Sequence, residues 1–281
     1  MTYKYILPVV LTALLGGTSY LHAAATFPFS PSGEQAGSTA IHASSSLIVG
    51  WATEVANLTR GPQNIANPSL GNASVGVGEN ALGAANGSLV SLGDGGSITL
   101  SFNTAITNGL GTDFAVFENA FRQSSSSPLY FLELAFVEVS SNGLDFFRFP
   151  SISLTQTETQ VGGFGNLDPT YIHNLAGKDL AGWGTAFDLA DMLGISPLLD
   201  VNAVTHIRLI DVVGSINPLY ASYDSLGNMI NDPYSTPFAS GGFDLDAIGV
   251  INQVPEPSRM LLILAGIAYG VTRRRKTNRC A

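Results

Sequence analysis

Short apolar runs separated by turns dominate this sequence between residues 26 and 252. Glycine, serine, asparagine and threonine recur between the runs, and long stretches with the 3.6-residue period of an amphipathic helix are scarce. A chain divided in this way buries its apolar side chains by pairing many short strands into sheets. We expect strands at 97–102, 113–118, 131–139, 146–149, 205–213 and 243–251.

Two local signals add detail to this pattern. Asn142 and Gly143 stand between two apolar runs, which is a strong indication of a hairpin joining the strands on either side. One short helix is expected over 187–194, because Asp188 can cap its start and Gly194 can end it.

The body of the chain, residues 26–252, has the length of one large or two small domains, and we interpret it as one. Its first part, 26–96, is the least patterned, and we expect one or two edge strands and long loops there. Many short strands with glycine-rich turns predict an all-β fold: an antiparallel two-sheet sandwich of jelly-roll-like type with one short helix.

The amino terminus has the three parts of a secretory signal. Lys4 gives it a basic start, residues 6–15 form an apolar core, and Ala23 and Ala25 satisfy the small-x-small rule for cleavage. We expect the Sec machinery to export the chain and signal peptidase to remove residues 1–25. A buried amino-terminal helix is the alternative.

The carboxyl terminus, residues 253–281, also has three parts. Two prolines within three residues form a stiff, accessible boundary, and the apolar segment 260–271 after it is shorter than the roughly 20 residues of a stable membrane span. A basic cluster follows and would stay on the cytoplasmic side. The boundary motif is Val254, Pro255, Glu256, Pro257 and Ser258, and the basic stop is Arg273, Arg274, Arg275 and Lys276.

This order of motif, apolar run and basic cluster resembles the PEP-CTERM sorting signal of Gram-negative bacteria. The resemblance implies transient insertion into the inner membrane through 260–271 and processing by an exosortase, a membrane cysteine protease-transpeptidase. The product would be released or attached to the cell surface or the exopolysaccharide matrix of a biofilm. An ordinary tail anchor, a single transmembrane segment, is the alternative, and in both cases the body is expected to face outward.

The body carries a second resemblance. Its segments 114–119, 137–143 and 242–250 resemble a group of uncharacterised bacterial cell-surface proteins thought to be jelly-roll β-sandwiches. The resemblance spans roughly 75–252 and implies a fold more than an activity.

The charge of the body excludes one class of function. Its 20 acidic and 5 basic residues give residues 26–252 a formal charge of −15. Nucleic-acid binding needs clustered Lys and Arg and is therefore excluded. The one cysteine, Cys280, lies in the carboxyl-terminal tail, so the body has neither disulfides nor a thiolate metal site.

The acidic body favours a divalent cation as a partner. Asp244 and Asp246 are two residues apart in an expected strand, so we expect their side chains on one face, where a cation would relieve their repulsion. Calcium prefers such oxygen ligands. The candidate calcium ligands are Asp244, Asp246, Asp224, Glu118 and Asp211. The alternative is that these are solvated carboxylates that form turns.

The catalytic signals are weaker. Glu133 and Glu138 are five apart in one expected strand and point to opposite faces, so they do not form a glycosidase pair by themselves, although Glu118 can pair with either across strands. The sequence has no Gly-x-Ser-x-Gly elbow. Aromatic residues in loops suit stacking on sugars, with partial burial as the alternative. They are Trp51, Trp183, Tyr171, Tyr220, Tyr223 and Tyr234.

These observations predict an exported, noncatalytic protein of the cell surface or exopolysaccharide matrix with a structural calcium site. The alternative is a secreted glycan-binding protein or glycan-active enzyme on a jelly-roll fold.

Overall fold

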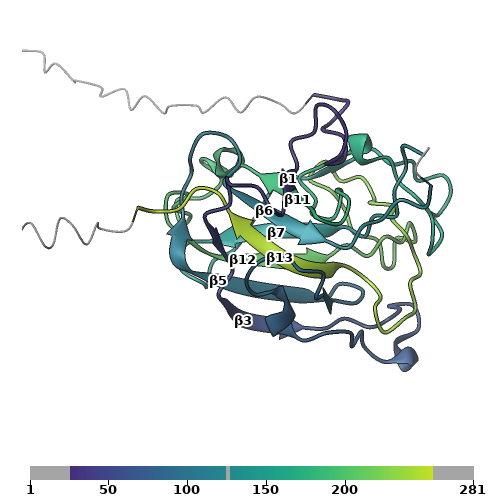
Figure 1. The fold of residues 1–281 in the computed structure, drawn as a ribbon. Coiled ribbons are helices and arrows are strands. Elements are labelled where there is room, and N and C mark those ends of the chain that lie inside the picture. The colour runs from purple at the N-terminus through teal and green to yellow at the C-terminus, as the bar shows by residue number, and fades with distance from the viewer. Residues whose placement is uncertain (1–25, 125–126, 256–281) are drawn as a thin grey trace, which may run out of the picture.

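The computed structural model describes residues 26–124 and 127–255. This part of the chain is all-β, and every strand pair in it is antiparallel. Two large sheets form the body, and in Figure 1 strands β6 and β13 of one sheet lie above β5 and β3 of the other.

The six-stranded sheet has β13 at its centre. Along the sheet the order is β1 (Ile41–His42), β11 (Trp183–Phe187), β6 (Phe114–Glu118), β13 (Asp244–Val250) and β2 (Gly50–Trp51). β4 (Val90–Ser91) also pairs with β13, at its amino-terminal end.

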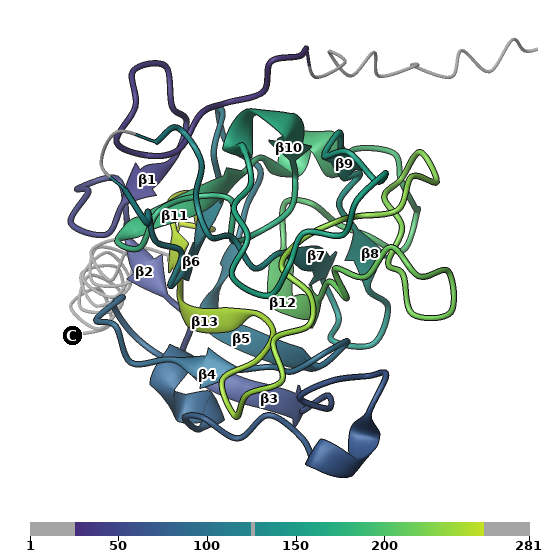
Figure 2. The same ribbon diagram turned by 90° about the vertical axis from the view of Figure 1, so that its right-hand side faces the viewer.

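The five-stranded sheet has the order β3 (Glu54–Thr59), β5 (Ser97–Ile106), β12 (Val204–Asp211), β7 (Ala135–Ser140) and β8 (Phe147–Arg148). A small separate pair is formed by β9 (Ile152–Ser153) and β10 (Ile172–His173). In Figure 2 this pair lies at the top of the molecule, and β3 and β4 lie at the bottom. The helical turns of the described residues are all 3₁₀: η1 (Pro68–Leu70), η2 (Gly78–Ala81), η3 (Pro169–Tyr171) and η4 (Leu189–Met192).

The main core joins the two large sheets. Phe114 and Ile248 of the six-stranded sheet and Leu100 and Leu209 of the five-stranded sheet belong to one cluster of fully buried side chains. Alternation along each strand places these residues inward, which is the arrangement expected of two stacked antiparallel sheets.

A second core packs under the long loops. Phe136 of β7 lies in it together with Tyr130, Leu132 and Leu134 of the preceding segment and Leu167 of the loop between β9 and η3. This cluster fixes the segment before β7 in place, and that segment contributes to the site described below.

The predicted strands at 97–102, 113–118, 205–213 and 243–251 are confirmed with small shifts in their ends. The predicted hairpin is also confirmed, because β7 pairs with β8 across the Asn142-Gly143 turn. The strand predicted over 131–139 begins only at Ala135. Before it, the Leu134 amide donates to the carboxylate of Asp232 at 3.1 Å instead of to a neighbouring strand.

The predicted helix over 187–194 is a single 3₁₀ turn, η4. Asp188 does cap it, since its side chain accepts from the Ala190 amide at 2.8 Å. The turn ends at once because Leu193 is extended, and the buried Leu189 amide is held by the carboxylate of Asp113 at 2.7 Å. The region 26–96 contains the long loops expected of it, but it has four strands, β1 to β4, where one or two edge strands were expected.

The predicted terminal signals meet the described residues only at their inner edges. The Val254 amide donates to the Ala105 carbonyl at 2.9 Å, and Pro255 follows it. Glu256, Pro257, Ser258, the basic stop and the segments 1–25 and 260–271 lie outside the described residues. Within the described ranges, none of the helices is long and apolar enough to cross a membrane.

Candidate functional site

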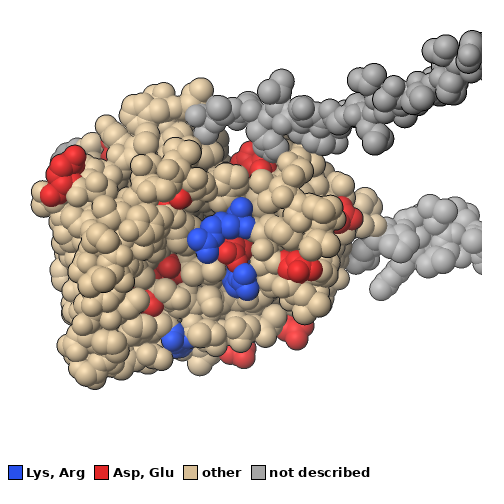
Figure 3. Space-filling view, turned by 180° about the vertical axis from the view of Figure 1, so that it is seen from behind, with Lys and Arg blue, Asp and Glu red and all other residues tan. Residues whose placement is uncertain are grey.

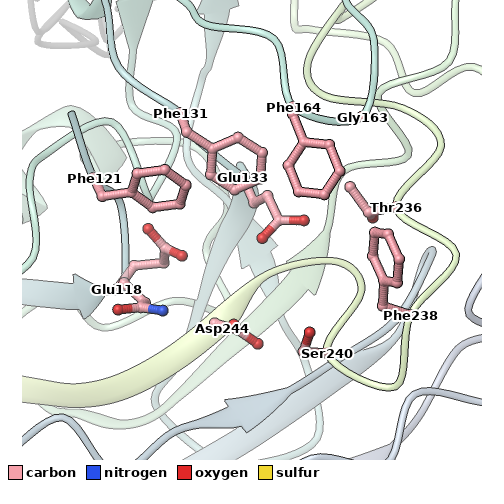
Figure 4. Close-up of a pocket in the computed structure, with 11 residues that line it drawn as sticks. Glu118, Phe121, Phe131, Glu133, Gly163, Phe164, Thr236, Phe238, Ser240 and Asp244 are labelled. Carbon is pink, nitrogen blue, oxygen red and sulfur yellow. The ribbon is translucent and has the colours of Figure 1, made fainter. Parts of the chain in front are cut away.

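A cavity of about 160 Å³ opens where β6 and β13 meet three loops. Figure 4 shows two glutamates and one aspartate directed toward it, with four phenylalanine rings around them. The lining residues are Glu118, Asn119, Phe121, Phe131, Glu133, Gly163, Phe164, Thr236, Phe238, Ser240 and Asp244.

Glu118 reaches the cavity because it is the last residue of β6. Its backbone pairs with Leu245 of β13, so both central strands of the sheet fix its position. Its carboxylate is almost completely buried, and its Oε2 has no hydrogen-bond partner. Burial, followed by the charge of Asp244, raises the pKa of Glu118 well above its usual range.

Glu133 enters from the segment that precedes β7. Its side chain is buried, and no basic side chain faces it among the described lining residues. Burial raises its pKa well above the usual range, and the charges of Glu118 and Asp244 act in the same direction.

Asp244 is the first residue of β13. Its Oδ1 accepts a hydrogen bond from the hydroxyl of Ser91 in the neighbouring β4. Burial raises the pKa of Asp244 to about 6, although the Ser91 bond opposes the shift. The cavity therefore holds three buried carboxyl groups with raised pKa values, and its described lining contains no lysine or arginine.

Further carboxylates lie near the cavity and have structural partners. Asp211 accepts from the amides of Gly95 at 2.9 Å and Phe243 at 2.7 Å, and so connects β12 to the loops beside β13. Asp94 accepts from the Ile65 amide at 2.7 Å. Burial raises the pKa of Asp211 well above the usual range and that of Asp94 to about 6.

The structure brings together only two of the five candidate calcium ligands. Glu118 and Asp244 line the cavity, whereas Asp246, Asp224 and Asp211 do not. Among the described residues, no group of three or more His, Cys, Asp or Glu side chains has an arrangement that could hold a metal ion.

The other candidates are satisfied by backbone amides. Asp246 accepts from the amides of Asn86 at 3.1 Å and Gly87 at 3.2 Å, after a register shift between Leu245 and Ala247 interrupts the regular pairing of β13 with β6. Asp224 accepts from the Leu226 and Asn228 amides of its own turn, at 2.9 and 2.8 Å, which is the turn-forming role considered as the alternative.

Glu138 is separated from Glu133, but not by alternation along one strand, because Glu133 lies before β7. It pairs with Arg148 at 2.9 Å and with Arg208 of β12, whose Nε donates to it at 2.7 Å. Figure 3 shows a face of the molecule with few charged side chains. At a single place on it, basic side chains (blue) gather around an acidic one (red). Of the pairings considered from the sequence, only Glu118 with Glu133 shares the cavity.

The aromatic residues at the cavity are phenylalanines rather than the tryptophans and tyrosines singled out from the sequence. Phe121 stacks on Phe131 with ring centroids 4.8 Å apart, Phe164 lies 6.4 Å from Phe131, and Phe238 lies 5.7 Å from Phe164. We call these four rings the phenylalanine row. Three of them are exposed, and Phe164 most of all, at 67%.

Of the six aromatic residues predicted in loops, Trp51 lies in β2 and Trp183 begins β11, and these two and Tyr234 have other partners. Trp51 packs on Phe117 at 5.6 Å, Trp183 packs on His42 at 4.8 Å, and the Tyr234 hydroxyl donates to Asn64 at 3.1 Å. Phe164 lies in the glycine-rich segment Gly162-Gly163-Phe164-Gly165, a composition typical of a surface turn, and its ring is at the surface.

No protein-family model matches this chain, and no curated protein matches its sequence significantly. The function is therefore inferred from the site itself.

Proposed function

We propose that the chain is an exported, noncatalytic protein of the bacterial cell surface or exopolysaccharide matrix, and that its β-sandwich binds a matrix ligand in the acidic cavity. The sandwich is of jelly-roll-like type in this proposal. A signal peptide at 1–25 and a PEP-CTERM-like sorting segment at 253–281 deliver it, with Sec, signal peptidase and an exosortase as processing partners.

The observation that carries the binding role is the buried Oε2 of Glu118, which has no hydrogen-bond partner and lies in an open cavity. A buried carboxylate oxygen without a partner costs free energy of folding, on the order of 1–3 kcal/mol. Burying three carboxyl groups where no basic side chain lines the cavity adds to this cost. Groups that weaken a fold are retained where they serve binding or catalysis, and the exposed phenylalanine row supplies an apolar contact surface beside them.

Retention on the exopolysaccharide of the producing cells tests this role. The purified protein should be retained, and a Glu118→Gln, Glu133→Gln, Asp244→Asn triple variant should elute early. Glu158→Gln, which changes an exposed carboxylate away from the cavity lining, is the matched control. Equal retention of the triple variant and the wild type would refute binding in the cavity.

Calcium remains our proposal for a structural cofactor, with Glu118 and Asp244, the two predicted ligands that line the cavity, as its carboxylate ligands. Because no three acidic side chains among the described residues form a metal site, Asn119, Thr236 or main-chain oxygens would have to complete the coordination. Thermal unfolding in EDTA and in millimolar calcium tests it. The unfolding temperature of the wild type should rise when calcium is added, and that of the triple variant should stay constant.

A glycan-active enzyme is the second candidate function. The observation that favours it is that Glu118 and Glu133 face one cavity with raised pKa values, as a general acid requires. Single Glu118→Gln and Glu133→Gln variants separate the two functions. An enzyme loses turnover of a matrix oligosaccharide in both variants, whereas a binding protein shows no turnover in any of them.

A further inference from the structure

The cavity is an acidic site that the protein's own cations do not reach. All five basic residues of the body are engaged elsewhere. Arg122 pairs with Glu34, and Arg148 and Arg208 pair with Glu138. Arg60 donates to the carbonyls of Val75, Gly76 and Ser91, and Lys178 donates to that of Ser30. The protein therefore supplies no cation to the cavity, and its carboxyl groups are neutralised either by protonation or by a cationic ligand.

The size of the cavity indicates an organic ligand. An apolar cavity of about 150 Å³ holds one benzene molecule, so about 160 Å³ accommodates one six-membered ring. A bare metal ion needs oxygens converging at about 2.3–2.6 Å, and the described acidic side chains do not assemble in that way.

The phenylalanine row defines the other side of the ligand. Aromatic rings attract a cation near their faces and also pack against the apolar face of a ring. The carboxylate of Glu118 is directed into the same space as the rings of Phe121 and Phe131 (Figure 4). A ligand that fits must combine a positive charge with an apolar ring face.

We propose that the cavity binds a hexosamine unit bearing a free, protonated amine. Its ammonium group donates to the unpartnered Oε2 of Glu118 and to Glu133 or Asp244, and its ring face packs on the phenylalanine row. This inference rests on the proposed function, because it names the chemical class of the matrix ligand.

Titration calorimetry with a glucosamine trisaccharide tests the proposal, and the N-acetylglucosamine trisaccharide is the matched ligand without the charge. The free-amine sugar should bind at least tenfold more tightly than the acetylated one. Glu118→Gln and Phe164→Ala should each weaken binding at least tenfold, and Glu158→Gln should leave it unchanged. Phe164 is largely exposed, so Phe164→Ala should keep its fold. It therefore tests binding even if the Glu118→Gln variant fails to fold.

Equal binding of the two sugars, or full binding by Glu118→Gln, would overturn the inference. Protection of the fold by calcium without any response to the free-amine sugar would also overturn it. Retention on exopolysaccharide that depends on the cavity and persists after N-acetylation of the polymer refutes the hexosamine alone and leaves the proposed function intact. If neither the untreated nor the N-acetylated polymer retains the wild-type protein, the hexosamine inference and the proposed function are both refuted.

Discussion

Because the cavity carboxyl groups have raised pKa values, we expect the folded protein to become less stable as the pH rises. The Asp244→Asn variant isolates the contribution of one of these groups. Burial raises the pKa of Asp244 in the folded state from the ordinary value of 3.8 to about 6. Well below pH 3.8, Asp244 is protonated in both the folded and the unfolded state, and its carboxyl group does not reduce the stability of the fold. As the pH rises, the unfolded state loses its proton first, so stability falls until both states are ionised above pH 6.

The magnitude follows from the shift. A pKa difference from 3.8 to about 6 corresponds to about 3 kcal/mol of unfolding free energy lost at pH 7.5. Asparagine has nearly the same shape and keeps an oxygen that accepts from Ser91, but it carries no charge. It also removes one of the charges that raise the pKa of Glu118 and Glu133.

We therefore expect Asp244→Asn to raise the unfolding free energy by about 3 kcal/mol at pH 7.5 and by only about 0.6 kcal/mol at pH 4. For a domain of this size the gain corresponds to roughly 6–12 °C in unfolding temperature. Urea or thermal unfolding followed by circular dichroism, in EDTA and without sugar, measures it.

The control for this measurement is Glu158→Gln, whose exposed carboxylate should give no difference at either pH. A variant that is less stable than the wild type at pH 7.5 would refute the reasoning, because Asp244 would then stabilise the fold as an anion. A gain of the same size at pH 4 and pH 7.5 would also refute it, since the effect would not be electrostatic.

Three further predictions concern the fold and its delivery. Gly242→Ala should destabilise by about 2–4 kcal/mol in urea unfolding, because its φ is 72° and a Cβ would lie 2.7 Å from an Asp211 carboxylate oxygen. Gly182→Ala, with similar φ but open space, should cost only about 1 kcal/mol, and equal costs would contradict the close approach. Glu138→Gln should lose about 1–2 kcal/mol, because a largely buried carboxylate pairs with two arginines that are each about a third exposed, and an unchanged unfolding midpoint would contradict this. Replacing both prolines of the Pro-Glu-Pro motif with alanine should retain the protein in the inner membrane on cell fractionation, and normal release to the surface would contradict exosortase processing.

The strand pattern could be predicted because it is local. The alternation over 97–102 and the Asn142-Gly143 turn each depend on a few neighbouring residues, and the structure has β5 and the β7–β8 hairpin there. The Asp188 cap was predictable for the same reason. The length of that helix was not, because the buried Leu189 amide is held by Asp113, which is distant in sequence.

The candidate site was predictable only in part. Glu118 and Asp244 were identified as acidic residues at strand ends, and they do share the cavity. Asp246 was expected beside Asp244 because regular strands alternate, but the register shift in β13 changes the pairing, and amides of the loop before β4 bind Asp246 instead. Asp224 was indistinguishable from a metal ligand in the sequence, since either role needs an oxygen in a turn.

The sequence by itself determined the all-β class, the acidic charge of the body and the scarcity of basic partners, because these depend on composition and on periodicity along the chain. Only the tertiary structure decided that Glu133 joins Glu118 and Asp244 and that four phenylalanines surround them. The reason is physical: these residues come from β6, β13 and three loops that are distant in sequence, and only the folded chain brings them to one cavity. Whether a carboxylate becomes a turn former or a site residue depends on which backbone amides the folded chain places beside it.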